Sequence, residues 1–216
     1  FGIGFSLKVK PGRPVPIRYY CEKQLETTVI CENCSLKYAI YGVFAHCPDC
    51  GVHNSKQILY KNLELSAKEI DLANLADDEM KELLLNDALE NVVSAFDGFG
   101  REVIKVRAHL SSNENEAKNI RFQNLDSARR NILRLFGIDI YNSISPEQWE
   151  FLIREFNKRH LIAHKMGIID EDYIRNTQDT DAVVGRKISL HQDEIIELIS
   201  TIKTLSNHMI EKLPAD

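Results

Sequence analysis

The sequence has no long hydrophobic run, no internal repeat or low-complexity tract, and no excess of positive charge. No apolar stretch approaches the roughly 18 residues that a membrane-spanning helix needs. A signal-peptide pattern is also missing, so we expect a cytoplasmic protein with no membrane contact. The net charge of -5 argues against a protein that coats nucleic acid indiscriminately. Any indication of a selective partner therefore has to come from local sequence patterns.

The charges that are present are unevenly distributed along the chain. Residues 121–134 hold four arginines against one acid, and residues 151–166 hold four basic residues against one acid. Residues 64–90 hold nine acids and two lysines. An acidic protein with local basic patches suits a selective contact with RNA better than bulk binding, although solvated helix faces explain the same pattern.

Four of the five cysteines form two Cys-x-x-Cys pairs, and twelve residues separate the pairs. The four are Cys31, Cys34, Cys47 and Cys50. Two such turns can present four thiolates tetrahedrally to zinc. Residues 25–30, 38–41 and 43–45 are expected to form short strands around them. We predict a zinc ribbon with one structural Zn²⁺ per chain, and no catalysis there because four sulfur ligands leave no open position.

Other interpretations of the cysteines are weaker. Disulfides do not suit a cytoplasmic chain, and a redox pair would not need a second Cys-x-x-Cys. His46 and His53 lie beside the cluster and could replace a cysteine as ligand, while Cys21 is expected to be a free thiol. Alternating apolar residues in positions 1–20 suggest further strands, so the N-terminal β domain is predicted to span residues 1–62.

From about residue 63 the apolar spacing becomes that of helices, which predicts a mainly α fold with a second domain over residues 63–216. Ser66 and Glu69 have the capping-box pattern, so a helix is expected to begin at Ser66. Its apolar stripe continues towards residue 110, and Gly98 and Gly100 could kink or interrupt it.

Three more helices are expected further along the chain. The first covers residues 117–136 and ends at Gly137. The second begins at Ser145, is followed by Gly167, and is expected to turn Trp149, Leu152, Phe156 and Ala163 inward. The third covers residues 192–211, and residues 170–190 are expected to be irregular. Successive helices without convincing strands between them imply a helical bundle.

The helix that begins at Ser145 carries the residues that point most directly to a function: Arg159, His160 and His164. A guanidinium can hold a phosphate through two hydrogen bonds. An imidazole titrates near neutral pH and can transfer a proton in a transition state. One copy of this set is a sparse active site, whereas two copies that meet across a two-fold axis would share one cleft.

Residues 156–167 resemble the Arg-polar-x-x-x-His segment of the HEPN superfamily, including the glycine just after the motif. The resemblance covers about residues 66–212, with the zinc ribbon as an appended module. Many members of that family are dimeric, metal-independent endoribonucleases of toxin–antitoxin and antiviral defence systems, and others bind RNA without cleaving it. The resemblance therefore implies a HEPN-like bundle, RNA as partner, a homodimer and a regulatory protein.

The resemblance also implies a role for each residue of the motif. Arg159 would be the phosphate clamp and His164 the proton-transfer residue, and His160 would add a second titrating group where the family often has asparagine. The implied reaction is attack of the RNA 2′-hydroxyl on the adjacent phosphorus, which leaves a 2′,3′-cyclic phosphate and a 5′-hydroxyl. The arginine would stabilise charge on the non-bridging oxygens, and the 2′-hydroxyl would make RNA the substrate.

Two further interpretations stay open. The protein could be a non-catalytic module that binds RNA or a protein partner, with the ribbon as adaptor. His160 and His164 also have the spacing of a metal-binding helix, but Leu161 stands where the hydrolytic version has glutamate. Arg130 and Arg134 share a helix face and could flank an RNA cleft, although an ordinary exposed charged face explains them more simply.

Overall fold

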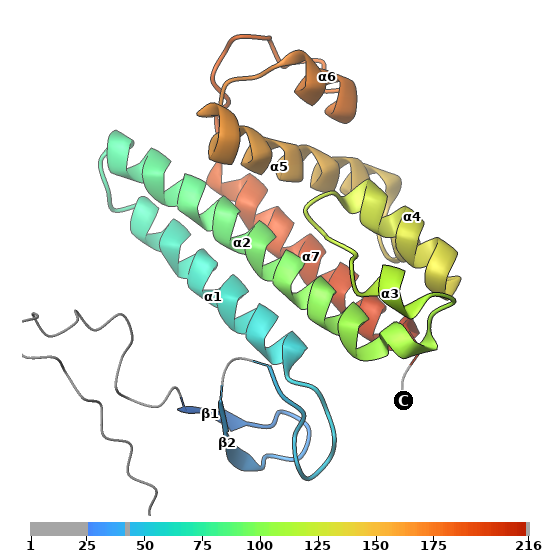
Figure 1. Ribbon diagram of the computed structural model, residues 1–216. Coiled ribbons are helices and arrows are strands. Elements are labelled where there is room, and N and C mark those ends of the chain that lie inside the picture. The colour runs from blue at the N-terminus through green and yellow to red at the C-terminus, as the bar shows by residue number, and fades with distance from the viewer. Residues whose placement is uncertain (1–25, 42–43, 215–216) are drawn as a thin grey trace, which may run out of the picture.

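The computed structural model describes residues 26–41 and 44–214, which form a helical bundle with a small β-sheet at its N-terminal end (Figure 1). The predicted mainly helical class and the N-terminal β region are both present. The strands expected within residues 1–20, together with Cys21 and Val43, lie outside the described residues. Within the described ranges, no helix combines the length and the apolar character needed to cross a membrane.

The sheet has two antiparallel strands, β1 (Glu26–Ile30) and β2 (Lys37–Tyr41), with Thr28 opposite Ala39. The strand expected over residues 43–45 does not form at Phe44 and Ala45. The backbone N–H of Ala45 instead donates to Oδ1 of Asn54 at 2.9 Å, and the N–H of Asn54 donates to the carbonyl of Ala45 at 3.0 Å. This part of the chain therefore closes a loop around the second cysteine pair.

The first two helices after the sheet are α1 (Ser55–Ala73) and α2 (Asp78–Arg107), which lie side by side (Figure 1). The predicted helix start at Ser66 is wrong, because Ser66 is buried inside α1. The apolar face of α1 continues on both sides of this serine, so packing outweighs the local capping pattern. The chain reverses after α1, and Asp77 caps α2 by accepting a hydrogen bond from the N–H of Met80 at 2.9 Å.

Gly98 and Gly100 do not interrupt α2, contrary to the expectation of a kink. Gly100 instead lets the fully buried ring of Phe122 lie against the helix, since a Cβ at this position would be 2.5 Å from the ring. The carboxylate of Asp97 accepts a hydrogen bond from the N–H of Phe122 at 2.7 Å. Together these contacts hold the segment before α4 against α2.

Two 3₁₀ turns and five more helices complete the described fold. They are η1 (Ala108–Leu110), α3 (Glu114–Ala117), α4 (Leu125–Phe136), η2 (Ile140–Ser143), α5 (Pro146–Lys165), α6 (Glu171–Thr177) and α7 (Gln192–Lys212). The start of α4 is later than predicted because the chain before it turns to bury Ile120 and Phe122. A short helix, α6, lies in the segment expected to be irregular, whereas α5 and α7 match their predictions closely.

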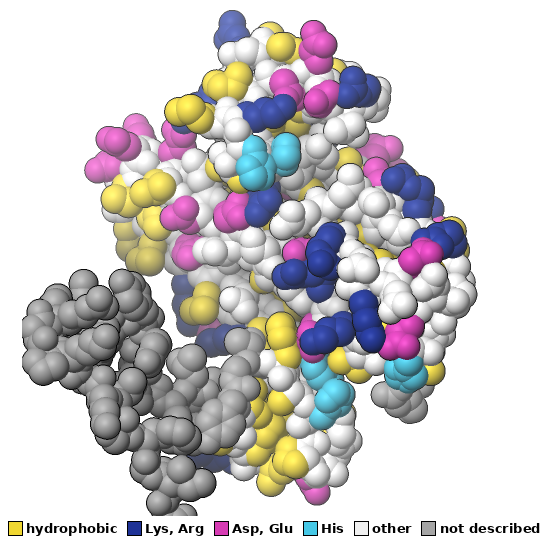
Figure 2. Space-filling model, viewed as in Figure 1, with side chains coloured by type: hydrophobic (Ala, Val, Ile, Leu, Met, Phe, Trp, Pro, Cys, Tyr) yellow, Lys and Arg dark blue, Asp and Glu magenta, His cyan; other side chains and the backbone are white. Residues whose placement is uncertain are grey.

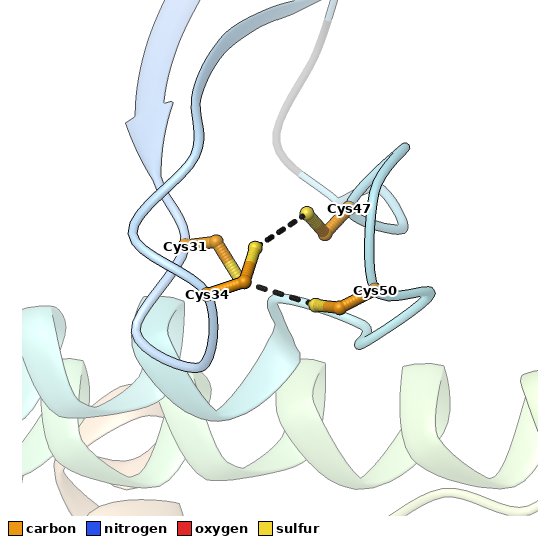
Figure 3. A group of neighbouring side chains, drawn as sticks. All are labelled: Cys31, Cys34, Cys47 and Cys50. Carbon is orange, nitrogen blue, oxygen red and sulfur yellow. Dashed lines mark hydrogen bonds between the residues drawn. The ribbon is translucent and has the colours of Figure 1, made fainter.

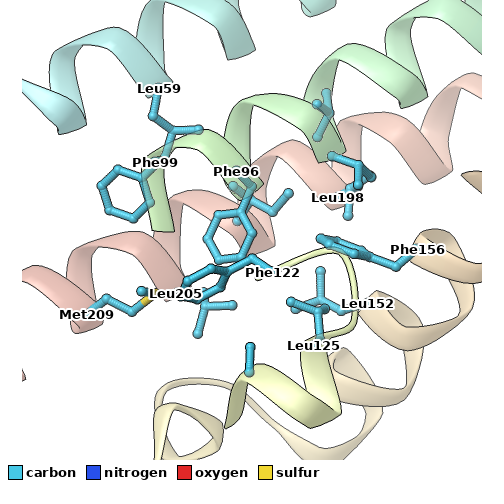
Figure 4. Packing of buried hydrophobic residues seen from close by; sticks show 14 of the residues in the cluster. Leu59, Phe96, Phe99, Phe122, Leu125, Leu152, Phe156, Leu198, Leu205 and Met209 are labelled. Carbon is cyan, nitrogen blue, oxygen red and sulfur yellow. The ribbon is translucent and has the colours of Figure 1, made fainter. Parts of the chain in front are cut away.

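A single large hydrophobic core joins α1, α2, α4, α5 and α7 (Figure 4). At its centre, the ring of Phe96 makes edge-to-face contacts with Phe122 at 5.6 Å and with Phe156 at 6.2 Å between centroids. Leu198 and Leu205 of α7 pack into the same core. Because Phe156 belongs to α5, this aromatic cluster fixes which face of α5 turns to solvent.

The two glycines of α2 provide a matched test of this packing. We expect Gly100→Ala to lower the free energy of unfolding by about 1–3 kcal/mol, because the added methyl group collides with Phe122. Gly98→Ala meets nothing within 4 Å, so it should raise the free energy of unfolding by about 0.5–1 kcal/mol through helix propensity. Urea denaturation measures both, and equal effects of the two substitutions would contradict the close approach of Phe122.

Candidate functional site

The second half of α5 presents three neighbouring side chains to three different surroundings. Successive helical residues are about 100° apart, so Lys158, Arg159 and His160 point in different directions. Lys158 is buried, Arg159 is mostly buried and His160 is exposed. His164 follows one turn later on the face of His160 and is also exposed. Ala163, which was expected to face inward, is exposed as well, so that prediction is wrong.

The guanidinium of Arg159 is held by Glu90 of α2. Its Nη2 donates to Oε1 of Glu90 at 2.5 Å, and the arginine side chain is 12% exposed. The buried Nε of Arg159 has no acceptor among the described residues. Glu90 is a site residue that sequence reasoning missed, although it lies in the acidic stretch of residues 64–90. Arg159 therefore links α5 to α2, while the N–H at its Nε forms no hydrogen bond with a described residue.

Lys158 forms a second link, from α5 to α7. Its ammonium lies 2.8 Å from Oε1 of Glu155 and donates to Oε1 of Glu194 at 2.6 Å. Burial raises the pKa of Glu155 to about 7, although the nearby Lys158 opposes this shift. The basic patch predicted over residues 151–166 is thus largely neutralised inside the protein, since both Lys158 and Arg159 are paired with acids.

His160 and His164 form an exposed pair of imidazoles. Their ring centroids are 4.8 Å apart, and their planes are inclined by 56°. Histidine side chains lie together on the surface near the end of α5 in the space-filling view (Figure 2). Partial burial of the ring lowers the pKa of His160, and the charges of His164 and Lys165 add to this effect. A neutral imidazole that can accept a proton is therefore favoured at position 160.

His160 lines two neighbouring hollows beside α5. The larger hollow, of about 540 Å³, lies between the start of α4 and α5. The smaller one, of about 210 Å³, lies between α5 and α6. Asn157, His160 and Asn176 line both. His160 thus stands at the junction of two spaces that a bound chain could occupy.

The arginines of α4 differ in what they contact. Arg129 makes two 2.7 Å hydrogen bonds with Asp139 and lies over the ring of Tyr141, so its role is structural. Arg134 donates to Glu116 at 2.5 Å. Arg130 is exposed, lines the larger hollow and has no ion pair with any described residue. Of the predicted pair Arg130 and Arg134, Arg130 is therefore the one whose charge is available.

The four cysteines of the two pairs gather at the end of the sheet (Figure 3). The Sγ atoms of Cys31 and Cys50 are 3.5 Å apart, those of Cys34 and Cys47 are 3.6 Å apart, and all four lie within 4.8 Å of one another. Four ligands at about 2.3 Å from a tetrahedral zinc would be about 3.8 Å apart, close to these spacings. Neither His46 nor His53 belongs to this group of potential ligands.

The crowding of these thiols opposes their simultaneous ionisation. A backbone hydrogen bond at Leu36 favours the thiolate of Cys34, but desolvation and the other three cysteines raise its pKa to about 12. A bound cation would remove this conflict, because metal ligation favours the deprotonated thiols. The chemistry and spacing of the four sulfur atoms therefore fit a metal ion.

The His160–His164 spacing does not extend to a second metal site in the structure. Among the residues that the structure describes, the cysteines form the one group of three or more histidine, cysteine or acidic ligands close enough to share an ion.

No family model matches the chain, and neither does any curated protein or solved structure. The resemblance to the HEPN superfamily therefore depends on the motif in residues 156–167 and on its place in a helical bundle.

Proposed function

We propose that the protein is a metal-independent endoribonuclease of HEPN type, whose site combines Arg159, His160 and His164 from two copies of the chain. The observation that supports this most is the exposed pair of imidazoles beside an arginine that Glu90 holds on the same stretch of α5. Proton-transfer groups and a guanidinium are the groups that metal-independent cleavage of RNA needs. A toxin or an antiviral effector is the class of protein that this activity fits.

The reaction needs two proton transfers: one proton leaves the 2′-hydroxyl, and one is added to the leaving 5′-oxygen. A neutral imidazole takes the proton of the 2′-hydroxyl, the 2′-oxygen attacks phosphorus, and the bond to the 5′-oxygen breaks. The imidazolium of the other histidine donates its proton to this leaving oxygen, which gives a 2′,3′-cyclic phosphate and a 5′-hydroxyl. The lowered pKa of His160 suits the base, and His164 then serves as the acid.

Arg159 would act from its paired position. A guanidinium has five N–H donors, so one edge can stay on Glu90 while another meets a non-bridging phosphate oxygen. Holding the arginine in advance reduces the conformational entropy lost when the phosphate binds. Glu90 would therefore be a positioning residue.

Exposed apolar side chains support contact with a second copy. Leu72, Leu75, Met80 and Leu83 are all exposed around the turn between α1 and α2, and Leu75 is 85% exposed. Hydrophobic side chains gather over this turn in Figure 2. Met166, directly after α5, is 84% exposed. Exposed apolar patches of this kind mark protein–protein contacts, and a homodimer is the simplest assembly that would complete the site.

Zinc is the metal that we propose for the cysteine cluster, with one ion per chain in a structural role. Four thiolates favour zinc over the hard cations that prefer oxygen ligands. The cluster lies next to the start of α1, where Nε2 of Gln57 donates to the carbonyl of Ile30 at 2.9 Å. A bound zinc would therefore fix the ribbon against the bundle and leave catalysis to α5.

A non-catalytic RNA-binding module is the second candidate. The low exposure of Arg159 and its ion pair with Glu90 favour this alternative, because both restrict access of a phosphate to the guanidinium. The two candidates differ in whether RNA is cut after it binds.

Cleavage of total RNA by the purified protein tests the proposed ribonuclease. Arg159→Ala and His164→Ala should each reduce cleavage by about 10²–10⁴-fold, because each removes a group that acts in the transition state. Arg134→Ala on α4 and His208→Ala on α7 are matched controls and should retain activity. The products should carry 2′,3′-cyclic phosphates, and cleavage should survive a chelator as long as the ribbon stays folded.

Binding without cleavage would support the module instead. Cleavage that continues in both Arg159→Ala and His164→Ala would show that another part of the protein is responsible.

Elemental analysis of the full chain tests the zinc site. We expect one zinc per chain, loss of the metal in Cys47→Ser, and full retention in the control Cys21→Ser, because Cys21 lies outside the two Cys-x-x-Cys pairs. Loss of zinc should also reduce the thermal stability of the ribbon. Protein that is isolated without zinc, or Cys47→Ser that keeps it, would contradict the assignment.

A further inference from the structure

The larger hollow beside His160 is a groove that several amide side chains line. Gln123, Asn157 and Asn176 line it, together with Arg130 and Asp126. Each amide offers both hydrogen-bond donors and an acceptor. Its volume of about 540 Å³ is within the range of pockets that bind small organic groups.

Several of these polar groups are not used by the protein itself. Gln123 and Asn176 are exposed and form no side-chain hydrogen bond with any described residue. Asn157 donates from Nδ2 to the carbonyl of Ile153 at 2.7 Å, which leaves its carbonyl oxygen available. Asp126 accepts a hydrogen bond from Nε1 of Trp149 at 3.3 Å and adds one negative charge to the lining. The groove therefore offers mainly neutral donors and acceptors.

Arg130 adds a single positive charge to this groove. The neighbouring Arg129 is neutralised by Asp139, and Arg134 by Glu116. An available guanidinium next to uncharged amides matches a ligand that combines one phosphate with a polar planar group. A long run of phosphates would instead require several unpaired cations.

The position of His160 also fits a nucleotide ligand in this groove. The same histidine lines the smaller neighbouring hollow, where Lys165 is paired with Asp170. A strand that passes from one hollow to the other would bring the bond between two nucleotides next to the imidazoles. The wider groove would then hold the nucleotide on one side of the bond.

We propose that the groove between α4 and α5 binds one nucleotide of single-stranded RNA next to the cleaved bond, and this proposal rests on the proposed ribonuclease function. Arg130 holds the phosphate of this nucleotide, and the amides of Asn157 and Asn176 form hydrogen bonds with the edge of its base. The base has to be unpaired, because in a duplex its edge is turned to the complementary strand. The groove therefore makes the enzyme selective for single strands and for certain bases.

Binding experiments with the full chain test the role of Arg130. The probes are labelled twelve-nucleotide RNAs, either single-stranded or in a duplex, and the protein carries His164→Ala to prevent cleavage. Arg130→Gln should weaken binding of the single strand about tenfold, because it removes a charge-assisted phosphate contact. Arg134→Gln removes the same charge four residues further along α4 and should leave the affinity within about twofold.

Cleavage mapping tests the amides in protein that keeps His164. Sequencing of the cleaved ends of a random RNA pool should reveal a base preference next to the cut. Asn176→Ala should change this preference by at least about fivefold, because it removes a hydrogen-bonding group that distinguishes one base edge from another. Asn142→Ala, an exposed asparagine outside the groove, should not change it.

The outcomes separate the two proposals. If the protein cleaves RNA but Arg130→Gln behaves like Arg134→Gln and the base preference is unchanged in Asn176→Ala, the groove proposal is wrong and the ribonuclease stands. Equal affinity for duplex and single strand also overturns the groove proposal. If the protein neither binds nor cleaves RNA, both proposals fail together.

Discussion

The orientation of α5 depends on two ion pairs that hold adjacent residues to different helices. Lys158 is held by Glu194 of α7, and Arg159 is held by Glu90 of α2. Partly buried pairs of this kind contribute little net stability, because desolvation of the charges offsets their attraction. They do specify a geometry, since a helix rotated by one residue would leave both cations without partners in a poorly solvated space. Phe156 adds the apolar part of the same constraint.

This constraint determines the chemistry of the exposed face. With Lys158 and Arg159 directed inward, His160 and His164 are directed outward, and the junction of the two hollows lies at His160. The available positive charge on this side is also small, because the acids of α2 and α7 neutralise most of the basic patch. A site with few free cations and many amides suits recognition of one nucleotide better than general attraction to RNA.

Local patterns in the sequence predicted the features that depend on local spacing. The two Cys-x-x-Cys turns predicted the cluster of four cysteines, because each pair of thiols is brought together by a short turn. Ser145 as cap with Pro146 in the first turn predicted the start of α5 correctly, and the structure adds a reciprocal hydrogen bond from Gln148. The capping-box pattern at Ser66 failed, because the apolar face of α1 runs through it and the buried surface outweighs a cap.

Contacts between residues far apart in the sequence could not be predicted from local patterns. The ion pair of Arg159 with Glu90 joins residues 69 positions apart, and periodicity carries no information about such a partner. For the same reason, the sequence did not distinguish Arg130 from Arg134, whose different partners come from other segments. The burial of Lys158 was also missed, because lysine is almost never fully buried unless it is paired, and its partner on α7 is 36 residues away.

A crystal structure with a short single-stranded RNA, blocked by 2′-O-methyl groups, would show most directly whether two copies of His164 meet at one phosphate. We expect two protein chains around the strand, with Arg159 and His164 within about 3.5 Å of the oxygens of the same phosphodiester. A strand bound by one chain alone, with His164 facing solvent and Arg159 still closed off behind Glu90, would contradict a shared ribonuclease site.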